Sequence, residues 1–269
     1  LARYRDSFYA SRIIHILNAL MGSIEQPGGL FYPKGPKDAG KSGLKSLAAA
    51  IPAVTEERAD GCGSRYPQWD KGAGMLQTAY AAIETGSPYP VKAYFIHRHN
   101  PMIALPDPKE QERIWAKLDL IVAVDVNFSE SAWYADVILP ENTFLERADI
   151  LRTEKGLKPG FGRRQQCVKP LNNTKAGWEI YLDLAKLMGK GEYFPFTTIE
   201  EIWQYQLQDT GLTLADFDAK GFVKLSKDPL WYDRNALKFG TKSGKIEIVN
   251  SQWEAMGIAS LPAYVPPQE

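Results

Sequence analysis

The sequence is poor in the residues from which metal sites and covalent catalytic sites are built. Its only two cysteines, Cys62 and Cys167, lie far apart and in no CxxC pair, so neither an iron–sulfur cluster nor a zinc site can be built from them. Its three histidines, His15, His97 and His99, lack metal-ligand spacing, and no GxSxG motif accompanies them. The residues therefore give no nucleophile–base constellation and no metal centre within this chain.

A strong net charge and a long apolar run are also missing. Lys plus Arg and Asp plus Glu both number 32, which gives no argument for a nucleic-acid partner. No apolar run approaches the roughly 20 residues that a membrane helix needs, so no direct membrane span is expected. The 269 residues, 44% of them apolar, suit one large or two small globular domains. The opening LARYRDSF has neither an initiator Met nor a signal segment, and we expect an excised piece of a longer polypeptide.

The stretch 92–149 organises the rest of the chain. Residues 91–96 form an apolar run with Tyr and Phe, bounded upstream by prolines, which predicts a buried strand. Residues 120–124, LIVAV, are apolar at every position, the pattern of a parallel strand covered on both faces. A helix is predicted over 109–118, between these strands, and a short strand over 137–139. The fold class is thus α/β, a parallel sheet with flanking helices like that of dinucleotide-binding domains.

Apolar residues at helical spacing predict further helices around this sheet, over 8–21, 75–84 and 177–188. Thr198 and Glu201 form a capping box at the start of another helix, and a short one is predicted over 214–219. Residues 33–69 and 151–169 are rich in Gly, Pro and basic residues, and both are predicted to be surface loops.

Asp125 ends the strand 120–124, at the sheet edge where open α/β folds bind ligands. A ligand-binding carboxylate is one interpretation of this residue. The other is a helix N-cap for the turn at 127–133. Ser129 and Ser131 have the same two interpretations, as donors to a ligand or as caps of that turn. Asp136 and Glu146 lie among strand and turn residues and are expected to have structural partners.

A long, ordered stretch resembles a known family. VDVNFSESAWYADVILPENTFLERAD (124–149) resembles the catalytic subunits of the molybdopterin-guanine-dinucleotide oxidoreductases, the DMSO reductase family. The triplet HNP (99–101) resembles the family's loop after the preceding strand, which usually reads Gly-x-Asn-Pro, with Arg98 and His99 in place of the customary small residues. WEI (178–180), YFPF (193–196), IEEI (199–202) and TKSGKIEIV (241–249) resemble the thiosulfate and polysulfide reductase branch.

The resemblance implies a site for one guanine-dinucleotide arm of the cofactor. Guanine offers two adjacent donors, and the carboxylate of Asp125 can accept both. Ser129 is the better candidate of the two serines for ribose or phosphate oxygens, and backbone N–H groups of residues 97–100 are candidates for a pyrophosphate, with Arg98 as charge partner. Arg164 falls where the family often has an Arg-x-Gln, and it is either a phosphate contact or part of a solvated basic loop. The residues expected to bind the cofactor are His97, Arg98, His99, Asn100, Pro101, Asp125, Val126, Asn127, Ser129, Arg164 and Gly177.

The resemblance also implies an organisation for the parent protein. Residues 1–175 would be the cofactor-binding α/β segment, and 176–269 a mainly helical segment leading to a C-terminal β-barrel domain beyond Glu269. The bis(molybdopterin guanine dinucleotide) molybdenum would receive its metal ligand, and an iron–sulfur cluster its cysteines, from residues preceding Leu1. The chain alone is then expected to have neither reductase activity nor bound molybdenum.

The implied enzyme is a thiosulfate or polysulfide reductase on the periplasmic side of the cytoplasmic membrane, with an iron–sulfur electron-transfer subunit and a quinol-oxidising membrane subunit as partners. A reductase for arsenate, tetrathionate or another oxyanion remains an alternative, because substrate-facing residues are mostly outside the chain. A second alternative is a scaffold without molybdenum, like the large subunit of respiratory complex I.

Overall fold

The computed structural model describes residues 7–48, 50–66 and 74–264. Two compact units are present, and each combines segments distant in sequence. The first unit contains Leu1–Gly43, Thr153–Phe161 and Val223–Glu269, and the second contains Leu44–Arg152 and Gly162–Phe222. The division expected between residues 175 and 176, into a cofactor-binding segment and a mainly helical segment, stays a prediction.

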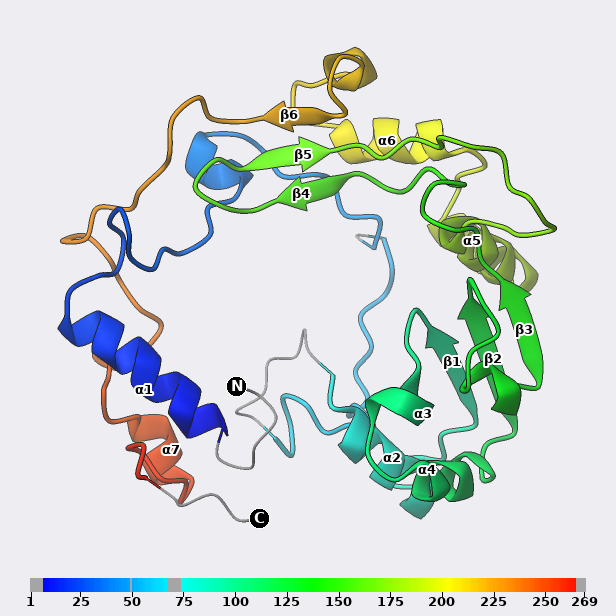
Figure 1. Ribbon diagram of the computed structural model, residues 1–269, viewed down its shortest axis with the longest axis horizontal. Helices are drawn as coiled ribbons and strands as arrows, with labels where there is room; N and C mark the ends of the chain where they lie inside the picture. The colour runs from blue at the N-terminus through cyan, green and yellow to red at the C-terminus, as the bar shows by residue number, and fades with distance from the viewer. Residues whose placement is uncertain (1–6, 49, 67–73, 265–269) are drawn as a thin grey trace. The chain divides into compact units, whose positions relative to one another are not determined.

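A three-stranded parallel sheet forms the centre of the second unit. Its strands are β1 (Ala93–His97), β2 (Leu120–Asp125) and β3 (Val137–Pro140), in the order β1-β2-β3 (Figure 1). Ile96 lies opposite Ala123, and Asp125 lies opposite Pro140. The two long apolar runs therefore share one sheet, as predicted, but β1 and β2 each extend one residue further because His97 and Asp125 still pair with the neighbouring strand.

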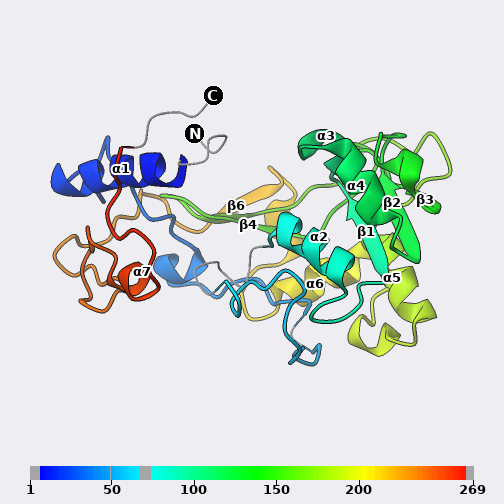
Figure 2. The same ribbon diagram turned by 90° about the horizontal axis from the view of Figure 1, so that it is seen from below.

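Both faces of this sheet are covered, which explains the unbroken apolar sequence of β2. On one face, Ile121 packs with Ile96 and with residues of α2 (Leu76–Thr85), α3 (Pro101–Ala104) and α4 (Pro108–Trp115). Figure 2 shows α4 against β1 and β2. On the other face, Val122 and Val124 pack against Ile180 of α5 (Gly177–Leu187). A strand that is buried on both faces has apolar residues at every position, whereas a half-exposed strand alternates polar and apolar residues.

Local capping sets where the helices of the second unit begin. Asp107 accepts a hydrogen bond from the backbone N–H of Glu110, and Pro108 follows it as the first residue of α4. Before α6 (Ile199–Leu207), the hydroxyl of Thr198 accepts from the N–H of Glu201 at 3.2 Å while the Glu201 carboxylate accepts from the N–H of Thr198 at 3.2 Å. The predicted capping box is confirmed.

Two helices predicted in this unit are corrected by the structure. The segment predicted as a helix over 214–219 is a 3₁₀ helix, η4 (Leu214–Phe217). The predicted helix 109–118 ends at Trp115 in the structure. A four-residue helix, α3, lies between β1 and α4, because Pro101 is pre-set for the first position of a helix. Two further 3₁₀ helices are η2 (Ala132–Tyr134) and η3 (Gly191–Tyr193).

A second three-stranded sheet corrects the prediction that 151–169 is only a surface loop. Its strands are β4 (Arg152–Glu154), β5 (Gly160–Gly162) and β6 (Phe222–Lys224), in the order β4-β5-β6. Each strand has three residues, too few for a period-two pattern to be read from the sequence.

The first unit contains α1 (Ser7–Leu20), η1 (Pro36–Ala39) and α7 (Ser251–Ala255). Arg12 of α1 donates hydrogen bonds of 2.6 Å to the carbonyl oxygens of Ser260 and Ile248. The fully buried side chains of Lys34 and Glu25 form an ion pair, and Glu25 also accepts from the N–H of Tyr232 at 2.9 Å. These contacts join the two ends of the sequence within this unit.

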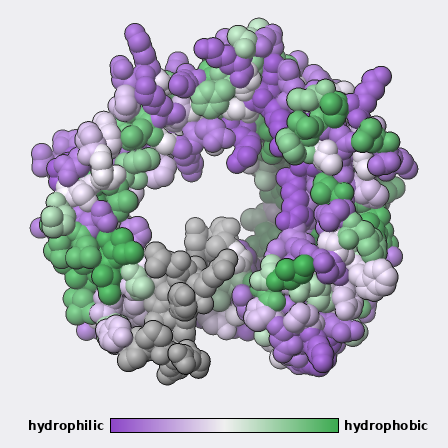
Figure 3. Space-filling view, in the orientation of Figure 1, coloured by the Kyte–Doolittle hydropathy of each residue, from purple (hydrophilic) through white to green (hydrophobic). Residues whose placement is uncertain are grey.

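The outer face of α1 is apolar. Hydrophobic residues gather over α1 in the space-filling view (Figure 3), and its exposed members are Ile13, Ile14, Leu17 and Leu20. In the described part of the chain, no helix has both the length and the apolar character needed to cross a membrane.

Candidate functional site

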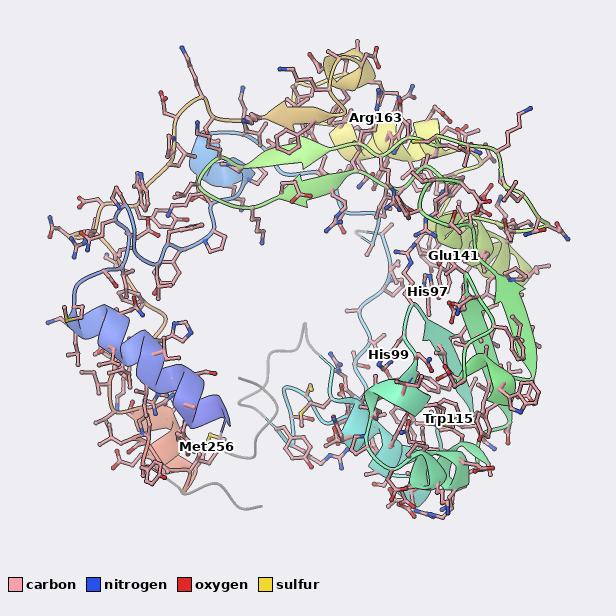
Figure 4. All side chains as sticks on the ribbon, in the orientation of Figure 1. His97, His99, Trp115, Glu141, Arg163 and Met256 are labelled. Atoms are coloured by element: carbon pink, nitrogen blue, oxygen red, sulfur yellow. The ribbon has the colours of Figure 1, made fainter. Side chains whose placement is uncertain are left out.

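The candidate site lies where the three parallel strands of the second unit end. β1 ends at His97, β2 ends at Asp125, and Glu141 follows β3 directly. Figure 4 shows His97 and Glu141 close together at this edge. A cavity of about 300 Å³ opens there, lined by Arg98, His99, Asn100, Asp125, Val126, Asn127, Ser129 and Glu141. All of these except Glu141 were predicted from the sequence.

The loop after β1 forms one side of the cavity. Arg98 has a φ of +55°, the left-handed region that favours glycine. Asn100 holds the loop in place, because its amide nitrogen donates to Glu130 at 2.7 Å and its oxygen accepts from Ser131. Within the described residues, the backbone N–H groups of His99 and Asn100 donate to no acceptor, whereas that of Arg98 belongs to the pairing of His97 with Val124 at the end of the sheet. The loop thus presents two unused donors beside the cavity.

Asp125 and the turn after β2 form the opposite side. One carboxylate oxygen of Asp125 accepts from the N–H of Val126 at 2.7 Å, and the other accepts from the hydroxyl of Ser129 at 2.8 Å. The helix-cap interpretation of Asp125 is wrong, because the only helix in this turn, η2, has Ser131 at its N-cap position. Each carboxylate oxygen has lone-pair capacity for another donor. Ser129 directs its proton at Asp125 and accepts from the N–H of Ala132 at 3.3 Å, so it first serves to orient the carboxylate.

A buried carboxylate forms the inner wall. The Glu141 side chain is 1% exposed and lies 2.8 Å from Nη2 of Arg98, 2.9 Å from Nη1 of Arg147 and 3.3 Å from Nε2 of His97. Burial disfavours the charged form of Glu141, but Arg98 and Arg147 outweigh it, so its pKa lies below the usual value. Glu141 is therefore an anionic anchor at the edge of the sheet.

Behind this wall, positive charge exceeds negative charge. Asp149 pairs with Arg147 at 3.3 Å and also with Arg164. The three guanidinium groups of Arg98, Arg147 and Arg164 thus share two carboxylates, those of Glu141 and Asp149, which leaves one formal positive charge in excess. Burial and the neighbouring Arg147 and Arg98 lower the pKa of Arg164. An anion near this cluster would relieve the repulsion among the arginines.

The remaining predicted residues support the cavity without lining it. A Cβ on Gly177 would lie 2.5 Å from Oε1 of Glu141 and 3.2 Å from Cε1 of His97, so only glycine permits this approach at the start of α5. Pro101 is fully buried as the first residue of α3. The structure therefore places His97, Pro101, Arg164 and Gly177 behind the lining residues. Asp136 and Glu146 have the expected structural partners, the N–H of Ile121 and the N–H groups of Thr143 and Leu171.

Glu141 and Arg147 were missed by sequence reasoning. A signal for Glu141 was available, since it directly follows a short apolar strand just as Asp125 follows a long one, and the ends of parallel strands meet at one edge. Arg147 gave no such signal, because its role depends on tertiary packing against Glu141. No group of three or more His, Cys, Asp or Glu side chains arranged to hold a metal ion occurs in the described ranges.

The fold and site define an α/β protein with a ligand cavity at the carboxyl edge of a parallel sheet. Comparison with known proteins places this architecture in a family. The family model for molybdopterin oxidoreductases matches residues 6–187, and the chain belongs to that family.

Several relatives share most of this chain. It is 30% identical, over 96% of its length, to the thiosulfate reductase molybdopterin-containing subunit of Salmonella typhimurium, and it covers 38% of that protein. It is 30% identical, over 87% of its length, to the arsenate respiratory reductase molybdopterin-containing subunit of a Shewanella species, covering 29% of that protein. The solved structure of acetylene hydratase from Pelobacter acetylenicus matches 71% of this chain with a TM-score of 0.60 and 28% identity, which is 26% of that chain. The chain thus spans well under half the length of these relatives.

The family implies a molybdenum–pterin cofactor, and the residues at the sheet edge fit part of such a group. The backbone donors of His99 and Asn100 and the excess positive charge suit the phosphates of a nucleotide arm. His97 Nε2 is buried behind the lining residues, 3.3 Å from the Glu141 carboxylate.

Proposed function

We propose that this chain binds one guanine-dinucleotide arm of a bis(molybdopterin guanine dinucleotide) cofactor in the catalytic subunit of a thiosulfate or polysulfide reductase. The observation that carries the proposal is the shared cavity. Asp125 and the loop of residues 98–100 come from two neighbouring strand ends and line the same space of about 300 Å³. Such a volume suits a ligand group of nucleoside size rather than a whole dinucleotide cofactor.

The base of the nucleotide is assigned to Asp125. The ring N1–H and the exocyclic amine of guanine are adjacent donors, and a carboxylate is the side chain that accepts both at once. Adenine presents an acceptor in place of N1–H, which would face a carboxylate oxygen. Ser129 donates to Asp125 at 2.8 Å and thereby orients the carboxylate for this role.

The phosphates are assigned to the opposite side of the cavity. The unused N–H groups of His99 and Asn100 supply donors, and the side chain of Arg98 supplies charge. Val126 and Asn127, in the turn after β2, line the cavity on the side of Asp125. Arg147 and Arg164 contribute to the positive field from behind, while His97, Pro101 and Gly177 shape the wall.

The cofactor supplies two-electron redox chemistry at molybdenum when it is bound. Thiosulfate reduction cleaves an S–S bond, takes up two electrons and two protons, and gives hydrogen sulfide and sulfite. The residues of this chain bind and orient the nucleotide arm and hold its position relative to the sheet. Electrons would come from an iron–sulfur subunit and ultimately from quinol, on the periplasmic side of the membrane.

The substrate is proposed on similarity. Identity of 30% over 96% of the chain to a thiosulfate reductase subunit supports a sulfur substrate. Identity of 30% over 87% to an arsenate respiratory reductase subunit supports reduction of another oxyanion as the alternative. A full-length protein that reduces arsenate or tetrathionate but neither thiosulfate nor polysulfide, in a dye-linked assay, would replace the first assignment with the second. A full-length protein that lacks molybdenum by metal analysis would instead favour a non-catalytic scaffold.

Nucleotide selectivity of the purified chain tests the binding role directly. Titration calorimetry with GDP and ADP is expected to give tighter binding of GDP, by about tenfold or more, because only guanine satisfies the Asp125 carboxylate. Equal binding of the two nucleotides, or binding of neither, would contradict the proposal. We expect no stoichiometric molybdenum in this 269-residue chain and no thiosulfate reduction by it, since the metal ligand and electron path are assigned to other parts of the parent protein.

A further inference from the structure

Arg98 and Glu141 form an unequal ion pair at the cavity. The Glu141 side chain is 1% exposed, whereas that of Arg98 is 51% exposed. Both residues line the cavity. The pair therefore has one partner fixed in the protein interior and one partner that reaches the space a ligand would occupy.

The contact uses only part of the guanidinium group. Nη2 of Arg98 donates to one oxygen of Glu141 at 2.8 Å, and Nε lies 3.4 Å from the other. Within the described residues, Nη1 donates to no acceptor. Guanidinium carries five N–H donors in a rigid plane, so a group held along one edge can bind a second anion along another.

Glu141 is itself held in place from several sides. Arg147 contacts it at 2.9 Å, and Gly177 leaves room for its carboxylate where any Cβ would come within 2.5 Å. The N–H of Glu141 donates to the carbonyl of Asp125 at 2.9 Å, which links it to the end of β2. A carboxylate anchored in this way fixes the direction of the longer, more exposed Arg98 side chain.

Building on the proposed function, we propose that Arg98 binds a phosphate oxygen of the guanine nucleotide through its free guanidinium nitrogen. Glu141 is the positioning residue that holds Arg98 toward the cavity. The base then lies at Asp125 and the phosphate at Arg98, on opposite sides of the same space. The alternative is that Glu141 competes with the phosphate for Arg98. Removal of Glu141 would then tighten GDP binding, whereas a positioning role for Glu141 means that its removal weakens GDP binding.

Paired titrations of GDP and guanosine into the purified chain separate phosphate binding from base binding. Arg98→Gln is expected to weaken GDP binding by about tenfold and to leave guanosine binding unchanged, because it removes a charge-assisted contact to phosphate only. Glu141→Gln is expected to weaken GDP binding severalfold, again without an effect on guanosine. The double variant is expected to bind GDP no more weakly than Arg98→Gln, since Glu141 acts through Arg98.

The matched control is Arg113→Gln. Arg113 of α4 is 47% exposed and pairs with Glu84 of α2 and with Glu110 of α4, and none of the three lines the cavity. Its replacement is expected to change neither titration. The salt dependence of GDP binding is expected to be shallower for Arg98→Gln than for the unaltered chain, because one phosphate contact is lost. If Glu141→Gln does not fold, Glu141→Asp takes its place, with the same selective loss for GDP because the shorter side chain draws Arg98 back.

Three results would overturn the inference. They are an unchanged GDP affinity in Arg98→Gln, a tighter GDP affinity in the Glu141 variant, and additive losses in the double variant. Failure of the proposed function looks different, because then the unaltered chain shows no preference for GDP over ADP. Selective binding of guanosine and GDP that is insensitive to Arg98 would keep the base site and refute only the phosphate contact.

Discussion

The side-chain oxygen of Asn100 accepts a hydrogen bond of 2.6 Å from the hydroxyl of Ser131, and this pair joins the loop after β1 to the turn after β2. The Ser131 hydroxyl also accepts from the N–H of Met102 at 3.1 Å, and its side chain is fully buried. Two strand ends that carry the lining residues of the cavity are thereby held at a fixed spacing. Such fixing lowers the ordering cost of binding a ligand between them.

Ser131→Ala should therefore destabilise the protein and loosen the cavity. The change leaves the buried N–H of Met102 without its partner, which costs about 1–3 kcal/mol, while the Asn100 oxygen keeps only the backbone N–H of Ser131 as a donor. Chemical denaturation measures this loss in the free energy of unfolding. GDP affinity should fall together with stability, because the two sides of the cavity lose their connection.

The control for this variant is Ser64→Ala. The Ser64 hydroxyl contacts the exposed carboxylate of Glu57 at 3.1 Å, and its loss should change stability by less than about 0.5 kcal/mol. If the two variants were equally stable, the Asn100–Ser131 pair would have no special structural role.

The sheet that carries the site was predictable because its signal is local and strong. Residues 120–124 are apolar without a break, and burial on both faces demands that pattern. The position of Asp125 at the strand end followed from the same run. The capping box at Thr198 was equally readable, since its two partners are three residues apart.

The ionic wall of the cavity and the second sheet could not be predicted, because both depend on contacts between residues far apart in the sequence. Glu141 acquires its role only when β3 brings it beside His97 and Arg98, which lie more than forty residues earlier in the chain. The strands β4 and β5 are three residues long and depend on β6, which comes much later in the sequence. Local composition favoured a loop there, and non-local pairing overrode it.

Gly177→Ala should disturb the cavity through Glu141, one of its lining residues. The new methyl group would lie 2.5 Å from the buried Glu141 carboxylate, and overpacking of this kind costs roughly 1–3 kcal/mol. We expect a lower melting temperature and weaker GDP binding, because Glu141 must move and Arg98 with it. Gly43→Ala is the control, since no atom lies within 4 Å of its Cβ position, and an unchanged melting temperature for both variants would refute the close approach.

The pH dependence of stability should contain a contribution from Asp60. Burial raises the pKa of this carboxyl, but hydrogen bonds from Arg58 and from the N–H groups of Cys62 and Met75 outweigh it and hold the pKa well below its usual value. A depressed carboxyl pKa stabilises the folded state above the unfolded value of about 3.9, and this stabilisation is lost as the pH falls below it. Asp60→Asn should therefore lower the melting temperature more at pH 7 than at pH 3.

The control for the pH prediction is Asp119→Asn. Asp119 pairs with Lys92 at 2.9 Å, but its side chain is 64% exposed, so its replacement should have little effect at either pH. An equal loss of melting temperature at both pH values for Asp60→Asn would show that packing, and not charge, explains its contribution.

The assignment of Asp125 to the guanine edge predicts discrimination between GDP and IDP. Hypoxanthine keeps the N1–H of guanine but lacks the exocyclic amine, so IDP offers the carboxylate one donor where GDP offers two. The purified chain should bind GDP about tenfold more tightly than IDP, the value of one charge-assisted hydrogen bond. Asp125→Ala should remove this preference by weakening GDP binding, with IDP binding less affected.

Asp125→Asn separates recognition of the base from support of the turn. The Asn oxygen can still accept from Ser129 or from the N–H of Val126, so the turn and the melting temperature should be largely retained. Its amide nitrogen, however, would place a donor against a donor of guanine, and GDP binding should fall nearly as far as in Asp125→Ala. If Asp125→Asn bound GDP as the unaltered chain does, while Asp125→Ala lost both stability and affinity, Asp125 would support only the turn and the base would have to bind elsewhere.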